Sequence, residues 1–498
     1  MDIIEEQLIT MKRELRKKEK HESVNIKGKF IIIRKDPYEW ITLEFRPNNQ
    51  SEWVPWLDHE EIFETNEGKV LYQIKPRLFQ HKGPWSDTEI LKTSEQDDYQ
   101  FARFKTCVET LRNSANWSWL VKLILNSKGN LKSKEVVNSR IVPKIGVKSL
   151  NAFVGCPGSG KSTFLAAFVN EMRNKYKILY VGTAHNNVNG FARKLVNLGL
   201  EKEIRILSEE SRLIQDNRRF HNSNAPDFNR KQKNKILDSA RITLSTVNKP
   251  IKSPADSKVQ ILLIDECTRV SLLEVLTLVY RLKDLKCLII AGDPRQLGAR
   301  IGEHDCVDAM RYIIAETDCN KWTLNRQYRF GDQICRPLSQ MYYQGDMTVA
   351  GSNVSTLRWI LIGDCDCDEM DKIGCVTEAK SALAIYRTSQ ETDKVIISPY
   401  KDQLSKINSM TEKDEGIRLK TTDSVQGDEF DHVIFSFGRH EKRGFINSKR
   451  INVSMSRAKK TLHVMINVKV LKLFKELAYQ IKAAEKLGHV SVINHSKR

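Results

Sequence analysis

Residues 155–162 have the composition and setting of a phosphate-binding loop. They read Gly-Cys-Pro-Gly-Ser-Gly-Lys-Ser, follow a short apolar run and precede a helical pattern, so they match GxxxxGK[ST] in its usual context. Glycine allows positive φ, backbone N–H groups cradle phosphate oxygens, Lys161 reaches the β and γ phosphates, and Ser162 would hold Mg²⁺. The residues expected to contact a nucleotide are Gly155, Pro157, Gly158, Ser159, Gly160, Lys161, Ser162 and Thr163.

Two adjacent carboxylates, Asp265 and Glu266, follow the apolar run Ile-Leu-Leu-Ile, 104 residues after Lys161. Ligands bind at the carboxyl ends of strands in parallel sheets. Asp265 can hold Mg²⁺ and Glu266 can orient or deprotonate an attacking water, because positioning and electrostatics dominate phosphoryl transfer. An Asp-Glu pair alone equally suits a helix cap. Together with the phosphate loop, the pair indicates NTP hydrolysis.

Three further polar residues would complete such a site. Gln296 follows a third apolar run within Gly-Asp-Pro-Arg-Gln, where its amide can sense a γ-phosphate through water, although a simple proline-containing turn is the alternative. Arg329 and Arg457 lie farther along the chain, and a planar guanidinium stabilises charge on a transferring phosphoryl group. Taken alone, each arginine is equally compatible with a surface salt bridge.

The composition favours a globular, nucleic-acid-binding protein. The 498 residues suffice for about three domains. There are 81 Lys and Arg against 62 Asp and Glu, and this net charge of +19 favours a polyanionic partner over a basic surface kept for solubility. Apolar residues make up 40% and charged residues 29%, which excludes a disordered or collagen-like chain. We expect no membrane span and no signal peptide, because long apolar runs are absent and the N-terminus is charged.

Ten cysteines are spread along the chain without the paired spacing of a zinc module. This predicts reduced thiols in a cytosolic or nuclear compartment. The densest group, Cys365, Cys367 and Cys375, lies among acidic residues. We expect an exposed acidic loop there rather than a soft-metal site.

Residues 1–130 are expected to form an accessory region. Apolar residues at helical spacing from Ile4 to Leu15 predict an amphipathic helix, and β-rich runs over 29–79 predict a small β-barrel or sheet. Helical patterns return at 97–126. The tryptophans of this region suit the core of a small β domain better than base stacking. They are Trp40, Trp53, Trp56 and Trp85.

After a polar, Lys-rich linker at 131–148, seven short apolar runs alternate with helical patterns. This is typical of parallel strands that crossover helices bury on both faces. The pattern predicts an α/β fold with two tandem domains, residues 149–322 and 323–498. The runs are LNAFVG, YKILYVG, RITLST, VQILLID, KCLIIAGD, KVIISP and HVIFSF.

The ordered motifs resemble those of superfamily 1 helicases, in the RNA-helicase branch that contains the nonsense-mediated-decay helicase, senataxin-like proteins and the nidovirus helicases. The similarity covers about residues 150–466. Besides the phosphate loop and the Asp-Glu strand, it rests on VGTAHNNVNGFARKL, ARITLSTVN, GDPRQLG, QYRF, VQGDEFDHVIFS and GFINSKRINVSMSRAKK. Alphavirus-like viral helicases are the alternative, because GCPGSGKS and VQGDEFDHV also look like theirs.

The resemblance implies two RecA-like parallel-sheet motor domains with an NTP site between them and translocation from 5′ to 3′. Relatives often carry a β-barrel on helical stalks, which residues 1–126 would match. The implied NTP site comprises Lys161, Ser162, Asp265, Glu266, Gln296, Arg329, Gly427, Glu429 and Arg457. The implied single-strand track comprises Thr183, Asn187, Thr246, Thr422 and the segment near Pro399.

The chain departs from these relatives in two places. Residues 130–149 contain no glutamine of the kind that reads adenine, so the resemblance does not predict which NTP is selected. The N-terminal region holds only Cys107, so we expect no zinc-binding domain like that of the nidovirus and decay helicases.

We therefore expect a helicase or translocase that requires Mg²⁺ and ATP, or another NTP, and acts on single-stranded RNA or DNA, with RNA favoured. It would be a monomeric motor, of host or viral origin, with residues 1–130 open to protein partners. A non-unwinding, NTP-gated RNA clamp is the alternative. Glu266, Gln296 and the two arginines favour the enzyme, because a clamp does not need them.

Overall fold

The structure is a computed structural model in which the chain forms two compact units, residues 1–112 with 301–304, and residues 113–300 with 305–498. Continuous stretches are described at 149–207, 240–252, 258–301, 304–363, 374–412, 415–438, 446–471 and 474–493. Shorter described segments are 25–35, 40–47, 62–65, 70–75, 78–82, 88–93, 106–107, 110–111, 119–126, 132–135, 145 and 221–222.

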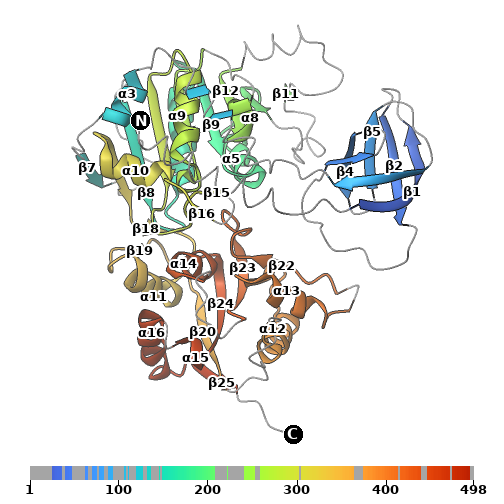
Figure 1. The fold of residues 1–498 in the computed structure, drawn as a ribbon. Helices are drawn as coiled ribbons and strands as arrows, with labels where there is room; N and C mark the ends of the chain where they lie inside the picture. The colour runs from blue at the N-terminus through green and yellow to red at the C-terminus, as the bar shows by residue number, and fades with distance from the viewer. Residues whose placement is uncertain are drawn as a thin grey trace. The chain divides into compact units, whose positions relative to one another are not determined.

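The first unit contains a closed β-barrel with strand order β1-β2-β5-β4-β3-β6, in which every pair is antiparallel (Figure 1). The barrel expected from the β-rich runs is thus present. Its strands are β1 (Asn25–Lys35), β2 (Trp40–Pro47), β3 (Ile62–Thr65), β4 (Val70–Lys75), β5 (Leu78–Lys82) and β6 (Thr88–Thr93). Trp40 begins β2, while the helix expected at Ile4–Leu15 and the other three tryptophans lie outside the described residues.

The second unit begins with a nine-stranded parallel sheet of order β11-β10-β12-β9-β13-β14-β8-β17-β7. Its central strands are buried along their whole length, as the continuous apolar runs predict. The strands are β7 (Lys132–Glu135), β8 (Ser149–Gly155), β9 (Ile178–Gly182), β10 (Ile204–Leu207), β11 (His221–Asn222), β12 (Ile242–Thr246), β13 (Ile261–Ile264), β14 (Cys287–Gly292) and β17 (Asn320–Leu324).

The helices of this first lobe bury the sheet. Phe164 and Phe168 of α4 and Phe191 of α5 join one core with Phe153 and Tyr180 of the sheet. The helices are α3 (Trp119–Asn126), α4 (Lys161–Met172), α5 (His185–Val196), α8 (Asn248–Lys252), the short 3₁₀ helix η1 (Cys267–Arg269), α9 (Leu272–Arg281) and α10 (Ala309–Glu316). Two short hairpin strands, β15 (Arg300–Ile301) and β16 (His304–Asp305), pair with each other.

A second lobe is built on a six-stranded parallel sheet of order β22-β21-β23-β24-β20-β25. Helices α11, α14 and α16 pack on one face, and α12 and α13 on the other. Successive residues of β20 alternate between these cores, Trp359 facing one and Ile360 the other. The expected α/β architecture of two tandem parallel-sheet domains is therefore confirmed.

The elements of the second lobe are β18 (Arg326–Gln327), α11 (Asp332–Tyr342), β19 (Thr348–Val349), β20 (Thr356–Ile362), α12 (Val376–Thr388), β21 (Lys394–Ser398), α13 (Lys401–Asn408), β22 (Leu419–Thr421), β23 (Phe430–Ser436), α14 (Ser448–Met455), β24 (Ala458–Asn467), α15 (Val468–Leu471), α16 (Lys475–Glu485) and β25 (Val490–Ile493).

The structure corrects three expected boundaries. The sequence Lys-Ser-Lys-Glu, assigned to the linker 131–148, forms edge strand β7, because backbone pairing with β17 needs no apolar side chains. Strand β17 runs to Leu324, past the expected boundary between 322 and 323. Helix α3, assigned to the accessory region, belongs to the second unit, where it contacts α9.

The cysteine prediction is wrong for Cys375. This thiol is buried, and it accepts a hydrogen bond from the backbone N–H of Glu378 at the start of α12, so it caps a helix instead of lying in an exposed loop. Cys365 and Cys367 lie outside the described residues.

Two histidines on neighbouring strands of the second sheet give the fold a pH dependence. The Nε2 of His432 lies 2.8 Å from the Nδ1 of His463, and the Nδ1 of His432 lies 2.7 Å from the Ser389 hydroxyl. Burial lowers the pKa of each histidine from 6.5 to about 4. The charges of His463 and Lys394 lower the pKa of His432 further, because like charges at this distance would repel, and the charge of Arg358 does the same for His463.

We expect the free energy of unfolding to fall as the pH drops from about 6.5 towards 4, because the unfolded chain then binds protons that the folded chain excludes. Thermal midpoints at pH 7, 6 and 5 measure this. The slope should be shallower in His463→Gln and unchanged in His489→Gln, a histidine outside the pair. Equal slopes in all three proteins would show that the pair does not titrate in this range.

Candidate active site

The phosphate loop joins the carboxyl end of β8 to the first residue of α4. Gly160 caps that helix with φ 83°, and Lys161 begins it. The Lys161 Nζ donates to the carbonyls of Gly155 at 2.8 Å and Cys156 at 3.2 Å, so the ammonium lies within the loop. The loop therefore places a cation and a helix N-terminus together, as phosphate binding requires.

Glycine is required at position 158 by both backbone angle and space. Gly158 has φ 72°, and a Cβ there would lie 2.6 Å from the Cβ of Arg329. The backbone N–H of Tyr328 donates to the Gly158 carbonyl at 2.9 Å. The phosphate loop thus touches the segment that enters the second lobe, and Arg329 lies beside it.

Asp265 and Glu266 follow β13, as the sequence predicts. The Asp265 Oδ2 accepts hydrogen bonds from the Ser162 hydroxyl at 2.7 Å and from the Tyr180 hydroxyl at 3.2 Å. Burial raises the pKa of Asp265, and the charge of Glu266 raises it further. The hydrogen bond from Ser162 and the charge of Lys161 lower it. Loop hydroxyl and strand-end carboxylate are therefore adjacent, which is the arrangement that two oxygen ligands of one Mg²⁺ need.

Glu266 adopts a left-handed backbone conformation, with φ 52° and ψ 39°. A non-glycine residue in this region is strained, and such strain clusters at functional sites. Its Oε2 accepts a hydrogen bond from the Gln426 Nε2 at 3.1 Å. A side chain of the second lobe thus reaches the carboxylate of the first that is expected to activate water.

The two predicted arginines occupy different surroundings. Arg329 forms an ion pair with Glu429 at 2.6 Å and donates to the Ser456 carbonyl at 2.6 Å. Arg457 is 2% exposed, and it donates to the carbonyls of Val453 at 2.9 Å and Asp428 at 3.2 Å. Burial and the neighbouring Arg329 charge lower the pKa of Arg457 to about 10, against an opposing influence from Glu266.

Gln296 is buried, and its Nε2 donates to the Oδ2 of Asp293 at 3.1 Å. The side-chain amide of Gln296 is therefore held through its nitrogen. Burial raises the pKa of Asp293, whereas Lys161 and a hydrogen bond from the Tyr343 hydroxyl lower it. Gln296 and Lys161 are thus both linked to one buried carboxylate that the motif analysis did not select.

The described residues fit a phosphorylated ligand. Buried side-chain atoms are normally hydrogen-bonded, yet several at this site have no protein partner in the described part of the chain. Donors and acceptors are both present, as a ligand with phosphate oxygens and bound water would need. The atoms are Ser159 Oγ, Gln296 Oε1, Arg329 Nε and Gln426 Oε1.

Comparisons with known proteins give the same assignment as the motifs. Two family models, both described as AAA domain, match residues 145–360 and 308–469. Replicase polyprotein 1ab of Alphamesonivirus 1 is 25% identical over 361 residues, which cover 66% of this chain. The ATP-dependent helicase NAM7 of Saccharomyces cerevisiae is 24% identical over 405 residues, which cover 67% of this chain. Together with the motifs, these similarities support a superfamily 1 helicase.

The chain spans only 7% of the length of the viral polyprotein and 41% of the yeast helicase. A crystal structure of Arterivirus nonstructural protein 10 (helicase) aligns with 90% of this chain and 80% of that chain, at 15% identity and a TM-score of 0.45.

The residues predicted for the single-strand track fall into two groups. Thr183 and Asn187 are partly exposed, with the Thr183 hydroxyl 3.5 Å from the Asn187 Oδ1. Asn187 also meets the second lobe, because a Cβ on Gly427 would lie 3.0 Å from its Nδ2. The other three are buried, and they are Thr246, Pro399 and Thr422.

Thr422 shows what the buried group does. Its hydroxyl lies 2.8 Å from the Ser454 hydroxyl of α14, so it holds the turn after β22 against that helix. In this conformation Thr422 is buried and positions the turn, so it is not part of an exposed surface for a nucleic-acid strand.

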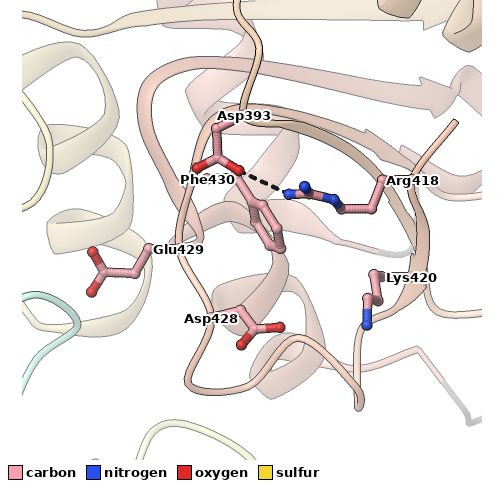
Figure 2. A pocket seen from close by; sticks show the side chains of 6 residues that line it. All are labelled: Asp393, Arg418, Lys420, Asp428, Glu429 and Phe430. Atoms are coloured by element: carbon pink, nitrogen blue, oxygen red, sulfur yellow. Dashed lines mark hydrogen bonds and ion pairs between the residues drawn. The ribbon is translucent and has the colours of Figure 1, made fainter. Parts of the chain in front are cut away.

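A pocket of about 300 Å³ opens in the second lobe beside Glu429 (Figure 2). Arg418 lies over the Phe430 ring and pairs with Asp393 at 2.8 Å. In Figure 2 the Glu429 carboxylate points away from Arg418 and Lys420. Of the six lining residues only Glu429 was predicted as a site residue, and its partner Arg329 ties it to the phosphate loop.

Sequence reasoning missed four residues of the site. Asp293 directly follows β14, so the strand-end rule that selected Asp265 could have found it. Tyr180 lies inside an apolar strand, and Tyr343 contacts Asp293 from the second lobe, outside the quoted motifs. Asn452 contacts the loop after β14 and lies within GFINSKRINVSMSRAKK, but the motif analysis gave it no role. In the described part of the chain, no helix is long and apolar enough to cross a membrane.

Proposed function

We propose that this chain is an NTP-dependent motor that moves along or unwinds single-stranded nucleic acid, RNA in preference, from 5′ to 3′. The observation that carries the proposal is the contact between Gln426 of the second lobe and Glu266 of the first, at 3.1 Å. Glu266 would serve the hydrolytic step, so a nucleic-acid-dependent shift of the second lobe would change the environment of that carboxylate directly.

The proposed reaction is attack of water on the γ-phosphorus of an NTP, which forms one P–O bond and breaks the bond to the bridging oxygen. Glu266 accepts the proton of the water at a carboxylate oxygen, and Lys161, Arg329 and Arg457 stabilise the charge on the phosphates. Ser162 and Asp265 would hold Mg²⁺, which neutralises phosphate charge when bound.

The function is tested by NTP hydrolysis measured alone, with single-stranded RNA and with single-stranded DNA, followed by strand displacement on duplexes with 5′ or 3′ overhangs. We expect stimulation by nucleic acid, more by RNA, and displacement from the 5′ overhang. Tight RNA binding with no stimulated hydrolysis would contradict the motor and favour the clamp.

Single-strand binding should weaken steeply with salt. Each phosphate that the protein neutralises releases condensed counterion and contributes about −0.7 to the slope of log K against log salt concentration. Fluorescence anisotropy of a labelled 12-mer between low and moderate salt measures the slope, and a second unrelated sequence should give the same slope. A flat response would mean that the net charge of +19 is ordinary surface charge.

We further propose a reducing compartment, the cytoplasm or nucleus of a cell, including an infected one. Within the described residues, five cysteines are free thiols, which such a compartment maintains; they are Cys156, Cys267, Cys287, Cys319 and Cys335. We propose a monomeric motor in which residues 1–130 bind protein partners.

A further inference from the structure

A buried polar contact joins the two lobes at the loop that carries Gln296. The Tyr343 hydroxyl, at the end of α11, donates to the Asp293 Oδ2 at 2.6 Å. Both side chains are buried, Asp293 at 2% and Tyr343 at 4% exposure. A hydrogen bond to a buried carboxylate is stronger than one between neutral groups, so this contact is a specific joint rather than general packing.

Asn452 of α14 completes the joint from the second lobe. Its Nδ2 donates to the Tyr343 Oη at 2.8 Å and to the Arg295 carbonyl at 3.1 Å. The Arg295 guanidinium lies over the Tyr343 ring, 5.1 Å from its centre. The loop after β14 is thus held at its carboxylate, its backbone and its guanidinium by the same two side chains.

This contact between the lobes is linked to a proposed site residue in each lobe, Gln296 in the first and Arg457 in the second. In the first lobe, the Asp293 Oδ2 that accepts from Tyr343 also accepts from the Gln296 Nε2 at 3.1 Å. Among the residues that the structure describes, the buried Gln296 Oε1 has no protein partner. In the second lobe, Asn452 is followed by Val453, whose carbonyl accepts from the Arg457 Nε at 2.9 Å.

We infer that Tyr343 is a positioning residue that sets Gln296 through Asp293 when the second lobe docks, which rests on the proposed function. Without the hydroxyl, the buried Asp293 carboxylate loses one of its two donors on Oδ2. The nearby Lys161 ammonium, whose charge already stabilises this carboxylate, would then draw it away from Gln296. The amide oxygen of Gln296 would no longer be held where water or a γ-phosphate could meet it.

Tyr343→Phe tests the inference, with Tyr342→Phe as the matched control. Tyr342 is the preceding residue and packs against the same core, but it lies near Glu476 rather than Asp293. We expect Tyr343→Phe to lower kcat of RNA-stimulated hydrolysis about tenfold or more, as misplaced catalytic groups do. Binding of a non-hydrolysable nucleotide should change about twofold or less, and Tyr342→Phe should leave kcat near wild type.

A double-mutant cycle identifies the residue through which Tyr343 acts. If it acts through Gln296, Tyr343→Phe should lower kcat less than about twofold in a Gln296→Ala background, because the two effects are then not additive. Asn452→Ala, which removes the donor to the same hydroxyl, should lower kcat like Tyr343→Phe, and it replaces that variant if the latter does not fold. Thermal midpoints of all variants separate positioning from loss of stability.

The inference is overturned alone if the wild type hydrolyses NTP and Tyr343→Phe matches Tyr342→Phe. It is equally overturned if the tenfold loss persists in the Gln296→Ala background. A wild-type protein that hydrolyses no NTP with any nucleic acid overturns the proposed function as well, so the two failures are distinguishable.

Discussion

Lys161→Ala is expected to reduce NTP hydrolysis by about 10³-fold or more, because it removes the cation that would neutralise the β and γ phosphates. The Lys161 Nζ is held by the Gly155 and Cys156 carbonyls at 2.8 and 3.2 Å. Both belong to the loop itself, so the substitution breaks no contact with another element through these bonds. The fold should remain intact, and phosphate release with saturating RNA measures the loss.

Lys175→Ala is the matched control for this variant. Lys175 is exposed just beyond the other end of α4, so its removal changes the net charge equally without touching the phosphate loop. Hydrolysis by Lys175→Ala should stay near wild type, and both variants should keep the wild-type thermal midpoint. Wild-type rates in folded Lys161→Ala would exclude residues 155–162 as the NTP site.

The predictable part of this fold is the part encoded in local apolar pattern. The runs at β13 and β14 are continuous because helices cover both faces, so the sequence alone identifies them as buried parallel strands. Strand β7 could not be found in this way. Its Lys-Ser-Lys-Glu sequence forms an edge through backbone pairing with β17, and pairing of backbones leaves no mark on side-chain composition.

The residues of the site likewise divide into those that the sequence predicts and those that only the fold brings together. The phosphate loop and the Asp265–Glu266 pair are contiguous motifs whose chemistry is set by adjacent residues, so sequence alone predicts them. Tyr343 and Asp293 lie 50 residues apart on different lobes and meet only in the folded chain. A tyrosine at the end of an amphipathic helical pattern signals a core position. The hydroxyl of Tyr343 gains its proposed role only because folding places Asp293 opposite.

The surroundings of Arg457 decide how it should respond to substitution. On sequence grounds, the simplest alternative to a catalytic role is a salt bridge with Glu429. In the structure that carboxylate pairs with Arg329, and burial together with Arg329 lowers the pKa of Arg457 to about 10. A buried cation beside a second cation is costly, so it calls for a compensating anion, which the phosphates of an NTP would supply.

Arg457→Ala should therefore lower kcat by about 10³-fold or more, as removal of an arginine that acts on a transferring phosphoryl group does elsewhere. Nucleotide affinity should fall far less, because the contact is made chiefly in the closed, transition-state-like arrangement. Single-turnover hydrolysis and nucleotide Kd, measured on one preparation, separate the two quantities. RNA binding without nucleotide should remain near wild type.

Lysine should not rescue this position. It lacks the planar fork that spans phosphate oxygens. In addition, the burial and the Arg329 charge that lower the pKa of the arginine would lower that of a lysine as well, from an ordinary value of about 10.4. Any residual activity of Arg457→Lys should therefore decline as the pH rises above neutrality, when the lysine loses its proton, whereas the wild type should not share that decline.

Arg450→Ala shows whether the loss is chemical or structural. Arg450 is a buried arginine of α14 that pairs with Asp423 at 3.1 Å, so removing it also costs a buried cation and its partner. It should lower the thermal midpoint with only a small loss of kcat, whereas Arg457→Ala should lose kcat out of proportion to stability. If both variants lose midpoint and kcat in parallel, Arg457 stabilises the turn around Val453 and nothing more. A normal kcat in Arg457→Ala would remove the arginine from the reaction and favour the NTP-gated clamp, which has no need of it.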